Sequence, residues 1–240
     1  MSLAASPAYA APFQINVEPS YFTGNFGYAH ALRIYEVPLA ILYRTQRLRL
    51  RVVIPYVAIA GAGLISGGTV LQGGHSSSFR SGLGDVWLSA QYRLIKSAGL
   101  RPAIKPLIRL ELPLASQRQG LGTGQFDGAF GARFDWRFAN TLFPYAQFDY
   151  RINGRVPGLS LRNAVTYQAG LTLALPHNQY VTGVLIGHGG FQYHVGPTDS
   201  VVAAYNINLN PEWGLAAYID RGLTSNSANF GAGFGVIAGF

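Results

Sequence analysis

Alternation of apolar and polar residues along short segments is the feature that most constrains the fold of this chain. Between residues 85 and 94, the even positions are Val, Leu, Ala, Tyr and Leu, whereas the odd positions are Asp, Trp, Ser, Gln and Arg. The segments 126–138 and 142–152 repeat the pattern. Successive side chains of a β-strand point to opposite faces of a sheet. The pattern therefore predicts strands with one apolar face and one charged face.

The composition indicates that the apolar faces meet lipid rather than a buried core. Only 12% of the 240 residues are charged while 49% are hydrophobic, and water-soluble domains usually carry about twice that charged fraction. No stretch reaches the roughly 18 uninterrupted apolar residues that a membrane helix needs. The chain has no Cys, which excludes disulfides and thiolate metal sites. These features favour a chain that crosses a membrane with strands.

The alternating pattern recurs about twelve times, and bacterial outer-membrane barrels have an even number of strands. We predict strands near 13–22, 30–44, 47–60, 83–95, 100–115, 124–139, 141–153, 162–175, 179–188, 199–209, 213–222 and 228–240. Short turns alternate with generally longer loops, as expected for the periplasmic and outer rims of a barrel. The sequence thus predicts an all-β fold: a transmembrane antiparallel up-and-down β-barrel in the outer membrane of a Gram-negative bacterium. Prolines inside strands leave the boundaries near Pro38 and Pro106 the least defined.

The two ends of the chain resemble processing and assembly signals. Residues 1–11 end on small residues, like the cleavage site of a secretory signal. We interpret them as a signal-peptide remnant or an artificial start, with an ordinary disordered N-terminus as the alternative, ahead of a single barrel domain over 12–240. Phe240 ends an alternating segment, and a terminal aromatic of this kind is thought to be read by the outer-membrane assembly machinery. We therefore predict Phe240 to be an assembly signal.

Three motifs in the middle of the chain resemble, in order, segments of a known family. They are Gly82-Leu83-Gly84-Asp85-Val86 followed by Gln91-Tyr92-Arg93-Leu94, then Arg109-Leu110-Glu111-Leu112-Pro113, and then Gly122-Thr123-Gly124-Gln125-Phe126-Asp127. Together they are similar to the phenol-degradation meta-pathway outer-membrane β-barrel family. The resemblance implies a barrel that passes small, often aromatic or hydrophobic molecules. The chain departs from the family at Leu114-Ala115, where a small polar residue and a glycine usually follow, and no catalytic residue carries over.

Charged side chains on the polar faces predict a solute path through the lumen. With both termini at the periplasmic rim, most basic residues lie in the lower half and most carboxylates lie toward the outer mouth. The predicted path consists of Arg49, Arg51, Arg93, Arg101, Lys105, Arg109, Arg133, Arg137, Asp85, Trp87, Glu111 and Asp127. One interpretation is a basic track that attracts anionic solutes. The other is a salt-bridge network between neighbouring strands that plugs or stiffens the barrel.

Aromatic residues near strand ends predict the boundaries between membrane and water. The predicted interface residues are Tyr43, Tyr92, Trp136, Phe138 and Trp213. Trp87 differs because it lies on the polar face, where it either fills space or stacks a ring-bearing solute. The Gly- and Ser-rich segment 61–82 is either an exposed loop or a constriction folded into the lumen. Arg80, Arg118, Arg155 and Arg162 in or beside the outer loops are candidate contacts for lipopolysaccharide phosphates, with solvated loop charges as the default alternative.

Other functional classes find little support in the residues. His75-Ser76-Ser77-Ser78 is the only adjacent base and nucleophile, and a Gly- and Ser-rich loop gives such a sequence by chance, so we predict no enzyme. His188 and His194 lack a carboxylate at ligand spacing, so we predict no metal and no cofactor. The net charge of +8 would fit nucleic acid, but the basic residues alternate with apolar ones inside strands, so no nucleic-acid partner is expected.

The leading hypothesis is an outer-membrane channel that passes small solutes, aromatic, hydrophobic or anionic, through a narrow charged lumen. Its expected partners are the lipid bilayer, lipopolysaccharide, the assembly machinery and the small-molecule solute. A non-conducting structural barrel plugged by lumen salt bridges is the first alternative. A lipid-modifying barrel enzyme is the second.

Overall fold

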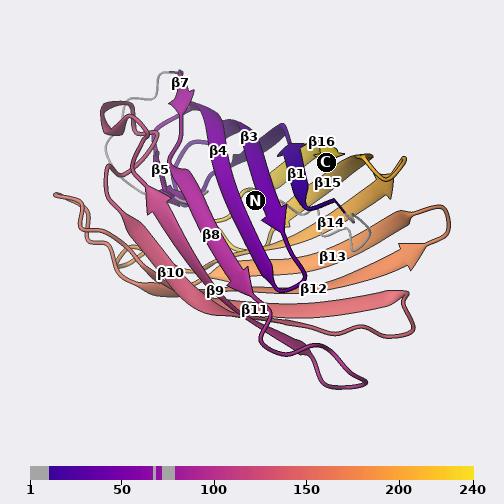
Figure 1. The fold of residues 1–240 in the computed structure, drawn as a ribbon. Coiled ribbons are helices and arrows are strands. Elements are labelled where there is room, and N and C mark those ends of the chain that lie inside the picture. Colours follow the sequence, from indigo (N-terminus) through magenta and orange to yellow (C-terminus); the bar gives the residue numbers. More distant parts are fainter. Residues whose placement is uncertain (1–10, 67–68, 72–78) are drawn as a thin grey trace.

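The computed structural model describes residues 11–66, 69–71 and 79–240 as an antiparallel sheet that curves round and closes on itself (Figure 1). Its strands are β1 (Phe13–Val17), β2 (Ser20–Gly24), β3 (Leu32–Arg44), β4 (Leu48–Ala60), β7 (Arg80–Leu83), β8 (Val86–Tyr92), β9 (Ala103–Leu112), β10 (Asp127–Asp135), β11 (Leu142–Ile152), β12 (Ala164–Leu175), β13 (Gln179–His188), β14 (Thr198–Asn208), β15 (Trp213–Gly222) and β16 (Phe230–Gly239). Both β1 and β2 pair with β3, and both β7 and β8 pair with β4. The 14 sheet segments therefore form twelve barrel strands, as predicted.

The barrel closes where the last strand meets the first. Ile15 of β1 lies opposite Ala238 of β16, and Tyr21 of β2 lies opposite Ala232. A closed sheet leaves no row of unpaired main-chain groups at an edge. The all-β fold and the antiparallel up-and-down order predicted from the sequence are confirmed.

No helix among the described residues is long and apolar enough to cross a membrane. The described helical structure is one short 3-10 turn, η1 (Gln117–Gln119), in the loop between β9 and β10.

The outer wall of the barrel is apolar and exposed. On β10 and β11, Phe130 and Phe148 are 55% and 53% exposed, and Phe130 lies opposite the equally outward Tyr150. Leu88 of β8 lies between Val52 of β4 and Leu110 of β9 in a similar outward row. Soluble monomers rarely expose apolar patches of this extent. An exposed apolar wall of this kind suits contact with acyl chains.

The prolines that left strand boundaries undefined lie within continuous strands. Pro38 of β3 and Pro55 of β4 lie opposite each other. The two residues that lack an N–H therefore occupy the same position of the ladder. The carbonyl of Pro38 accepts from Glu18 N at 3.4 Å, and that of Pro55 accepts from Gly84 N at 2.8 Å. Pro106 lies inside β9 opposite Ala132. The two boundary doubts are therefore removed, because β3 and β9 continue through these residues.

A hairpin formed by β5 (Leu64–Ser66) and β6 (Thr69–Leu71) crosses the mouth of the barrel at the long-loop end (Figure 1). We call it the cap hairpin. Ile65 packs against inward residues of β3 and β4, whereas Leu64 and Leu71 pack against Ala164 of β12 and Phe191 beyond β13. Of the two alternatives for segment 61–82, its described part takes the second and folds into the lumen.

Hydrogen bonds that end on main-chain carbonyls hold the cap hairpin and the residues before it in place. Tyr28 Oη donates to the carbonyl of Leu71 at 2.9 Å, and Ile65 N donates to Gly120 O at 3.1 Å. Arg80 donates to the carbonyls of Gly61 and Gly63. The predicted contact of Arg80 with lipopolysaccharide is therefore wrong, because its buried guanidinium is directed toward these loop carbonyls inside the barrel.

Candidate functional site

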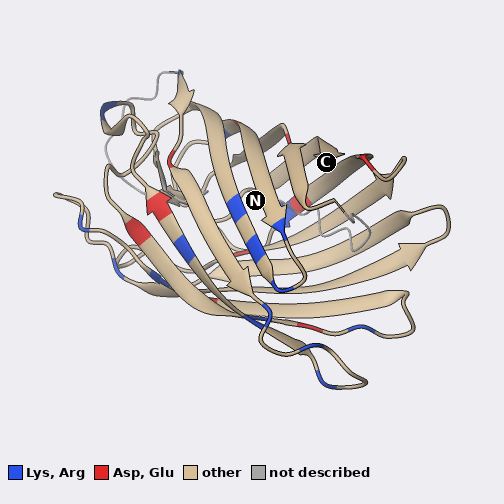
Figure 2. Cartoon of the chain, viewed as in Figure 1, with Lys and Arg blue, Asp and Glu red and all other residues tan. Residues whose placement is uncertain are grey.

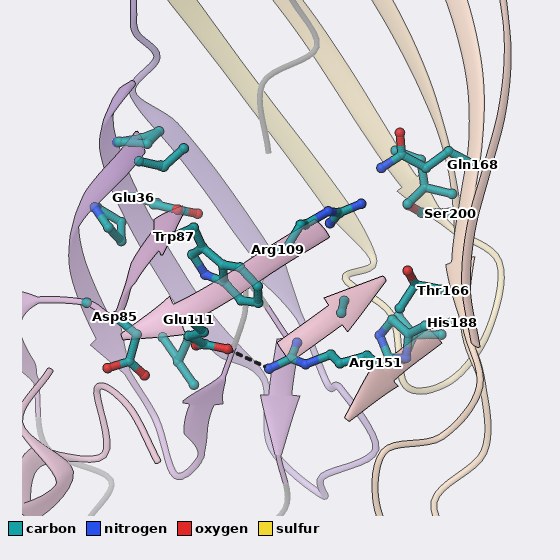
Figure 3. A pocket seen from close by; sticks show the side chains of 18 of the residues that line it. Glu36, Asp85, Trp87, Arg109, Glu111, Arg151, Thr166, Gln168, His188 and Ser200 are labelled. Atoms are coloured by element: carbon teal, nitrogen blue, oxygen red, sulfur yellow. Dashed lines mark hydrogen bonds and ion pairs between the residues drawn. The ribbon is translucent and has the colours of Figure 1, made fainter. Parts of the chain in front are cut away.

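A cavity of about 410 Å³ lies inside the barrel beneath the cap hairpin. Its two walls differ in chemistry. The wall formed by β4 and β8–β11 carries Arg49, Arg51, Asp85, Trp87, Arg109, Glu111, Arg133 and Arg151. The facing wall of β12–β14 presents Thr166, Gln168, His188 and Ser200, all without a carboxylate or guanidinium (Figure 3). The arginines of the described cavity lining therefore all lie on one wall, whereas carboxylates also come from Glu18, from Glu36 of β3 and from Asp220 of β15.

A cluster centred on Arg151 forms the outer part of the charged wall. Arg151 Nη2 lies 2.7 Å from Glu111 Oε2 (Figure 3). It also pairs with Asp127. Its guanidinium lies 5.1 Å from the ring centroid of Trp87 and 4.9 Å from that of Phe191. Arg151, Glu111 and Asp127 are 4%, 0% and 2% exposed. Because both carboxylates are buried, the charge of Arg151 is needed to balance their negative charges. Loss of Arg151 would leave two buried charges without a counter-charge.

The three motifs that carried the family resemblance meet at this cluster. Glu111 belongs to the second motif and Asp127 ends the third. Asp85 of the first motif accepts a hydrogen bond from Ala115 N at 3.0 Å, and a Cβ at Gly122 would lie 2.4 Å from an oxygen of Asp85. The glycine of the third motif therefore leaves space for the aspartate of the first. Their shared geometry is a packed, charged junction at the outer ends of β8–β10.

Deeper in the barrel, other basic residues of the charged wall are also paired. Arg109 contacts Asp149. Lys105 and Arg133 lie directly opposite each other on β9 and β10, and Asp135 neutralises both at 3.0 and 2.9 Å. The guanidinium carbon of Arg133 lies 3.8 Å from the ring centroid of Tyr145. These contacts agree with the salt-bridge interpretation for this part of the wall.

Arg49 and Arg51 of β4 differ from this group. Both line the cavity, and neither takes part in the ion pairs found within 4 Å across residues 11–66, 69–71 and 79–240. The buried Nε of Arg51 meets no hydrogen-bond acceptor in the described part of the chain. Two guanidiniums that face the cavity thus retain binding capacity.

The residues of the predicted solute path occupy three environments. Arg49, Arg51, Asp85, Trp87, Arg109, Glu111 and Arg133 line the cavity. Arg93, Lys105 and Asp127 lie partly or fully buried but do not line it, and Arg101 and Arg137 are exposed at the short-turn rim. Figure 2 shows basic positions along β4 and acidic positions at the outer ends of β9 and β10. Their part in solute passage stays a prediction.

The predicted interface aromatics all lie toward the short-turn rim. Tyr43 and Tyr92 are near or at the ends of β3 and β8, Trp136 and Phe138 follow β10, and Trp213 begins β15. Trp136 Nε1 donates to Leu100 O at 3.0 Å. Phe240 exchanges main-chain hydrogen bonds of 2.9 and 3.2 Å with Phe13. The interface role and the assembly role of these residues stay predictions.

The histidines show no arrangement for chemistry within the described residues. His188 stacks on Phe191 with ring centroids 4.1 Å apart, and His194 lies in a loop. No group of three His, Cys, Asp or Glu residues that could hold a metal occurs in the part of the chain that the structure describes. The segment His75-Ser76-Ser77-Ser78 lies outside the described residues.

Sequence reasoning missed two parts of the site. The polar residues on the facing wall, such as Gln168 and Ser200, occupy inward positions that the alternation itself could have identified. The apolar roof formed by the cap hairpin with Leu121 and Phe26 had no such signal, because its contacts join loops far apart in the sequence.

Comparison with known proteins supports the fold. The chain matches no protein-family model and no curated protein sequence. Among solved structures it is similar to an outer membrane channel from Pseudomonas putida F1, at 15% identity and a TM-score of 0.75 over 100% of both chains. It is similar to the CymD monoaromatic hydrocarbon channel, at 9% identity and a TM-score of 0.56 over 96% of this chain and 89% of that one.

A third similar structure is the translocator domain of the autotransporter NalP from Neisseria meningitidis. It shares 12% identity and a TM-score of 0.61 over 98% of this chain and 91% of that one. Since both channels and a translocator have this architecture, the likeness establishes fold and not function. The chain has the fold of outer-membrane β-barrels.

Proposed function

We propose that this barrel is a passive outer-membrane channel for small solutes. The observation that carries the proposal is the cavity of about 410 Å³ inside the barrel, whose wall includes Arg49 and Arg51 without ion-pair partners among the described residues. A lumen needed only for stability would have no use for half-buried cations that contact no carboxylate within ion-pair distance. The likeness to the solved outer membrane channel from Pseudomonas putida F1 and to CymD supports the same function.

The lumen would select solutes by charge. Charged side chains that line a narrow pore with poorly solvated walls raise the local concentration of ions of opposite sign. The proposed path runs from the cap hairpin past Arg109 to Arg49 and Arg51, and ends at the short-turn rim near Arg93. Exposed Arg118, Arg155 and Arg162 are the proposed contacts for lipopolysaccharide phosphates, and Phe240 is the proposed signal for the assembly machinery.

A non-conducting structural barrel is the second candidate, and one observation favours it. All five ion pairs found in the described residues lie on the inward face, and the cap hairpin covers the mouth. In such a barrel the pairs would stiffen neighbouring strands and exclude ions.

Single-channel recording in planar bilayers separates the two candidates. The channel predicts discrete conductance steps from the refolded protein, and heat-denatured protein from the same preparation serves as the control. Absence of steps above that control, with the barrel shown to be folded by its heat-modifiable mobility in gels, would contradict the channel and favour the structural barrel.

A further inference from the structure

We propose that the cavity binds a small amphipathic monocarboxylate, with its carboxylate on Arg49 and Arg51 and its apolar body directed toward the cap hairpin. This inference deepens the proposed channel function and rests on it, because such a molecule would be the solute that the channel conducts. The solute would combine one anionic group with an apolar group of about one ring.

The inward face of β4 changes from cationic to apolar along a single strand. Its inward residues, in order toward the cap hairpin, are Arg49, Arg51, Val53, Pro55, Val57 and Ile59, and all but the last line the cavity. The step from Arg51 to Val57 spans about 20 Å at about 3.3 Å per residue. A ligand with a charged end and an apolar end would match this wall in one orientation only.

The two arginines are the cations that the lumen leaves available. Arg109, Arg133, Arg151 and Lys105 already contact carboxylates, whereas Arg49 and Arg51 form no such pair in the described residues. A guanidinium binds a carboxylate through two parallel N–H donors, and two guanidiniums on one strand face present such donors side by side. The partnerless Nε of Arg51 is the type of donor that a bound anion would satisfy.

An apolar surface of ring size adjoins these arginines. Trp87 of β8 lies directly opposite Val53 on β4, and both face the cavity with Pro55 and Leu107. The ring of Trp87 can therefore receive an aromatic or aliphatic body whose carboxylate is on Arg51. Longer bodies would reach the roof, where Ile65 and its neighbours of the first apolar cluster are buried.

The remaining carboxylates favour one negative charge over two. Glu18 and Glu36 line the same cavity and attract Arg51 electrostatically without contacting it within 4 Å. They would repel the second charge of a dianion such as a phosphate monoester or a dicarboxylate. The site therefore fits a monocarboxylate best.

Trp87 provides a direct readout of binding. The chain has three tryptophans, so Trp136→Phe with Trp213→Phe leaves Trp87 as the sole tryptophan. In this background, reconstituted in lipid nanodiscs, 4-bromophenylacetate should quench the fluorescence of Trp87 with saturation. The neutral isostere 4-bromophenylacetamide should bind at least about tenfold more weakly, because it offers no charge to the two guanidiniums. Unbrominated phenylacetate should compete, and acetate should compete at least about tenfold less well.

The arginine variant tests the position of the carboxylate. Arg49→Gln with Arg51→Gln should weaken binding of 4-bromophenylacetate about tenfold or more while leaving the affinity for the amide unchanged. Arg47→Gln, an exposed residue in the turn before β4, is the matched control and should bind like the parent. Equal affinities for acid and amide in the parent protein would overturn the proposal without any variant, so it remains testable if the double variant fails to fold.

The outcomes for the ligand and for the channel are separable. Conductance in planar bilayers together with equal binding of acid and amide would leave the channel standing and remove the monocarboxylate. Selective binding of the acid without conductance would support the monocarboxylate and contradict the channel. The cavity would then capture its ligand in a closed barrel.

Discussion

Replacing Arg151 by Gln should destabilise the barrel severely. Arg151 is 4% exposed, and it is the cation that the structure places between Glu111 and Asp127, themselves 0% and 2% exposed. Removing one partner of a buried ion pair costs about 3–5 kcal/mol, mostly because the remaining charge is left uncompensated. With two carboxylates stranded and contacts to two aromatic rings weakened, we expect Arg151→Gln to lie at the upper end of that range.

The assay is reversible unfolding by urea in liposomes, followed by tryptophan fluorescence and by heat-modifiable gel mobility. Arg155→Gln, exposed in the loop that follows β11, is the control, and its cost should stay within about 0.5 kcal/mol. Adding Glu111→Gln and Asp127→Asn to Arg151→Gln should recover most of the loss, because no buried charge then lacks a partner. If Arg151→Gln costs no more than the control, or if the triple variant is as unstable as the single one, the proposed role of the ion pair is refuted.

Leu88→Arg, on the outward face near the middle of β8, should cost about 2–4 kcal/mol in the same unfolding assay, whereas the inward Ser89→Arg should cost much less; equal costs would contradict the assigned facing of β8. Arg80→Met should loosen the cap hairpin, because the donors to Gly61 and Gly63 are lost, and should raise the mean single-channel conductance above that of the parent. The channel should prefer anions at low salt, and reversal potentials should show the preference shrinking once the screening length falls to about 8 Å at physiological ionic strength; a preference independent of salt would exclude an electrostatic origin.

The outer-membrane barrel could be predicted from the sequence because its determinants are local. A strand of period two that meets lipid on one side and a lumen on the other must alternate, and each strand carries that pattern by itself. The strand limits at 179–188 and 213–222 agree with β13 and β15 residue for residue. The alternation also placed Trp87 and Ser89 inward and Leu88 outward. The cavity lining, which includes Trp87 and Ser89, and the register of β8 agree with this placement.

The partners of the lumen charges could not be obtained this way, because they depend on how neighbouring strands are staggered. By register Arg151 lies opposite Ala129, and Ala129 lies opposite Arg109, which would set two arginines in one row with no carboxylate. The pairs form diagonally instead, from Arg151 to Asp127 one strand away and to Glu111 two strands away. The sequence therefore predicted which charges face the lumen but not which of them are neutralised.

The roof of the cavity was likewise decided by tertiary structure alone. Leu64 and Leu71 contact Ala164 and Phe191, about one hundred residues away along the chain, and the segment 61–82 carries no alternation that would direct it inward. Local patterning determined which side chains face lipid and which charged side chains face the lumen. A strand at the lipid boundary is stable only with its apolar face outward. The position of the cap hairpin, and the lack of an ion pair for Arg49 and Arg51 among the described residues, were decided by closure of the sheet. Only the closed barrel brings opposite walls and distant loops within contact distance.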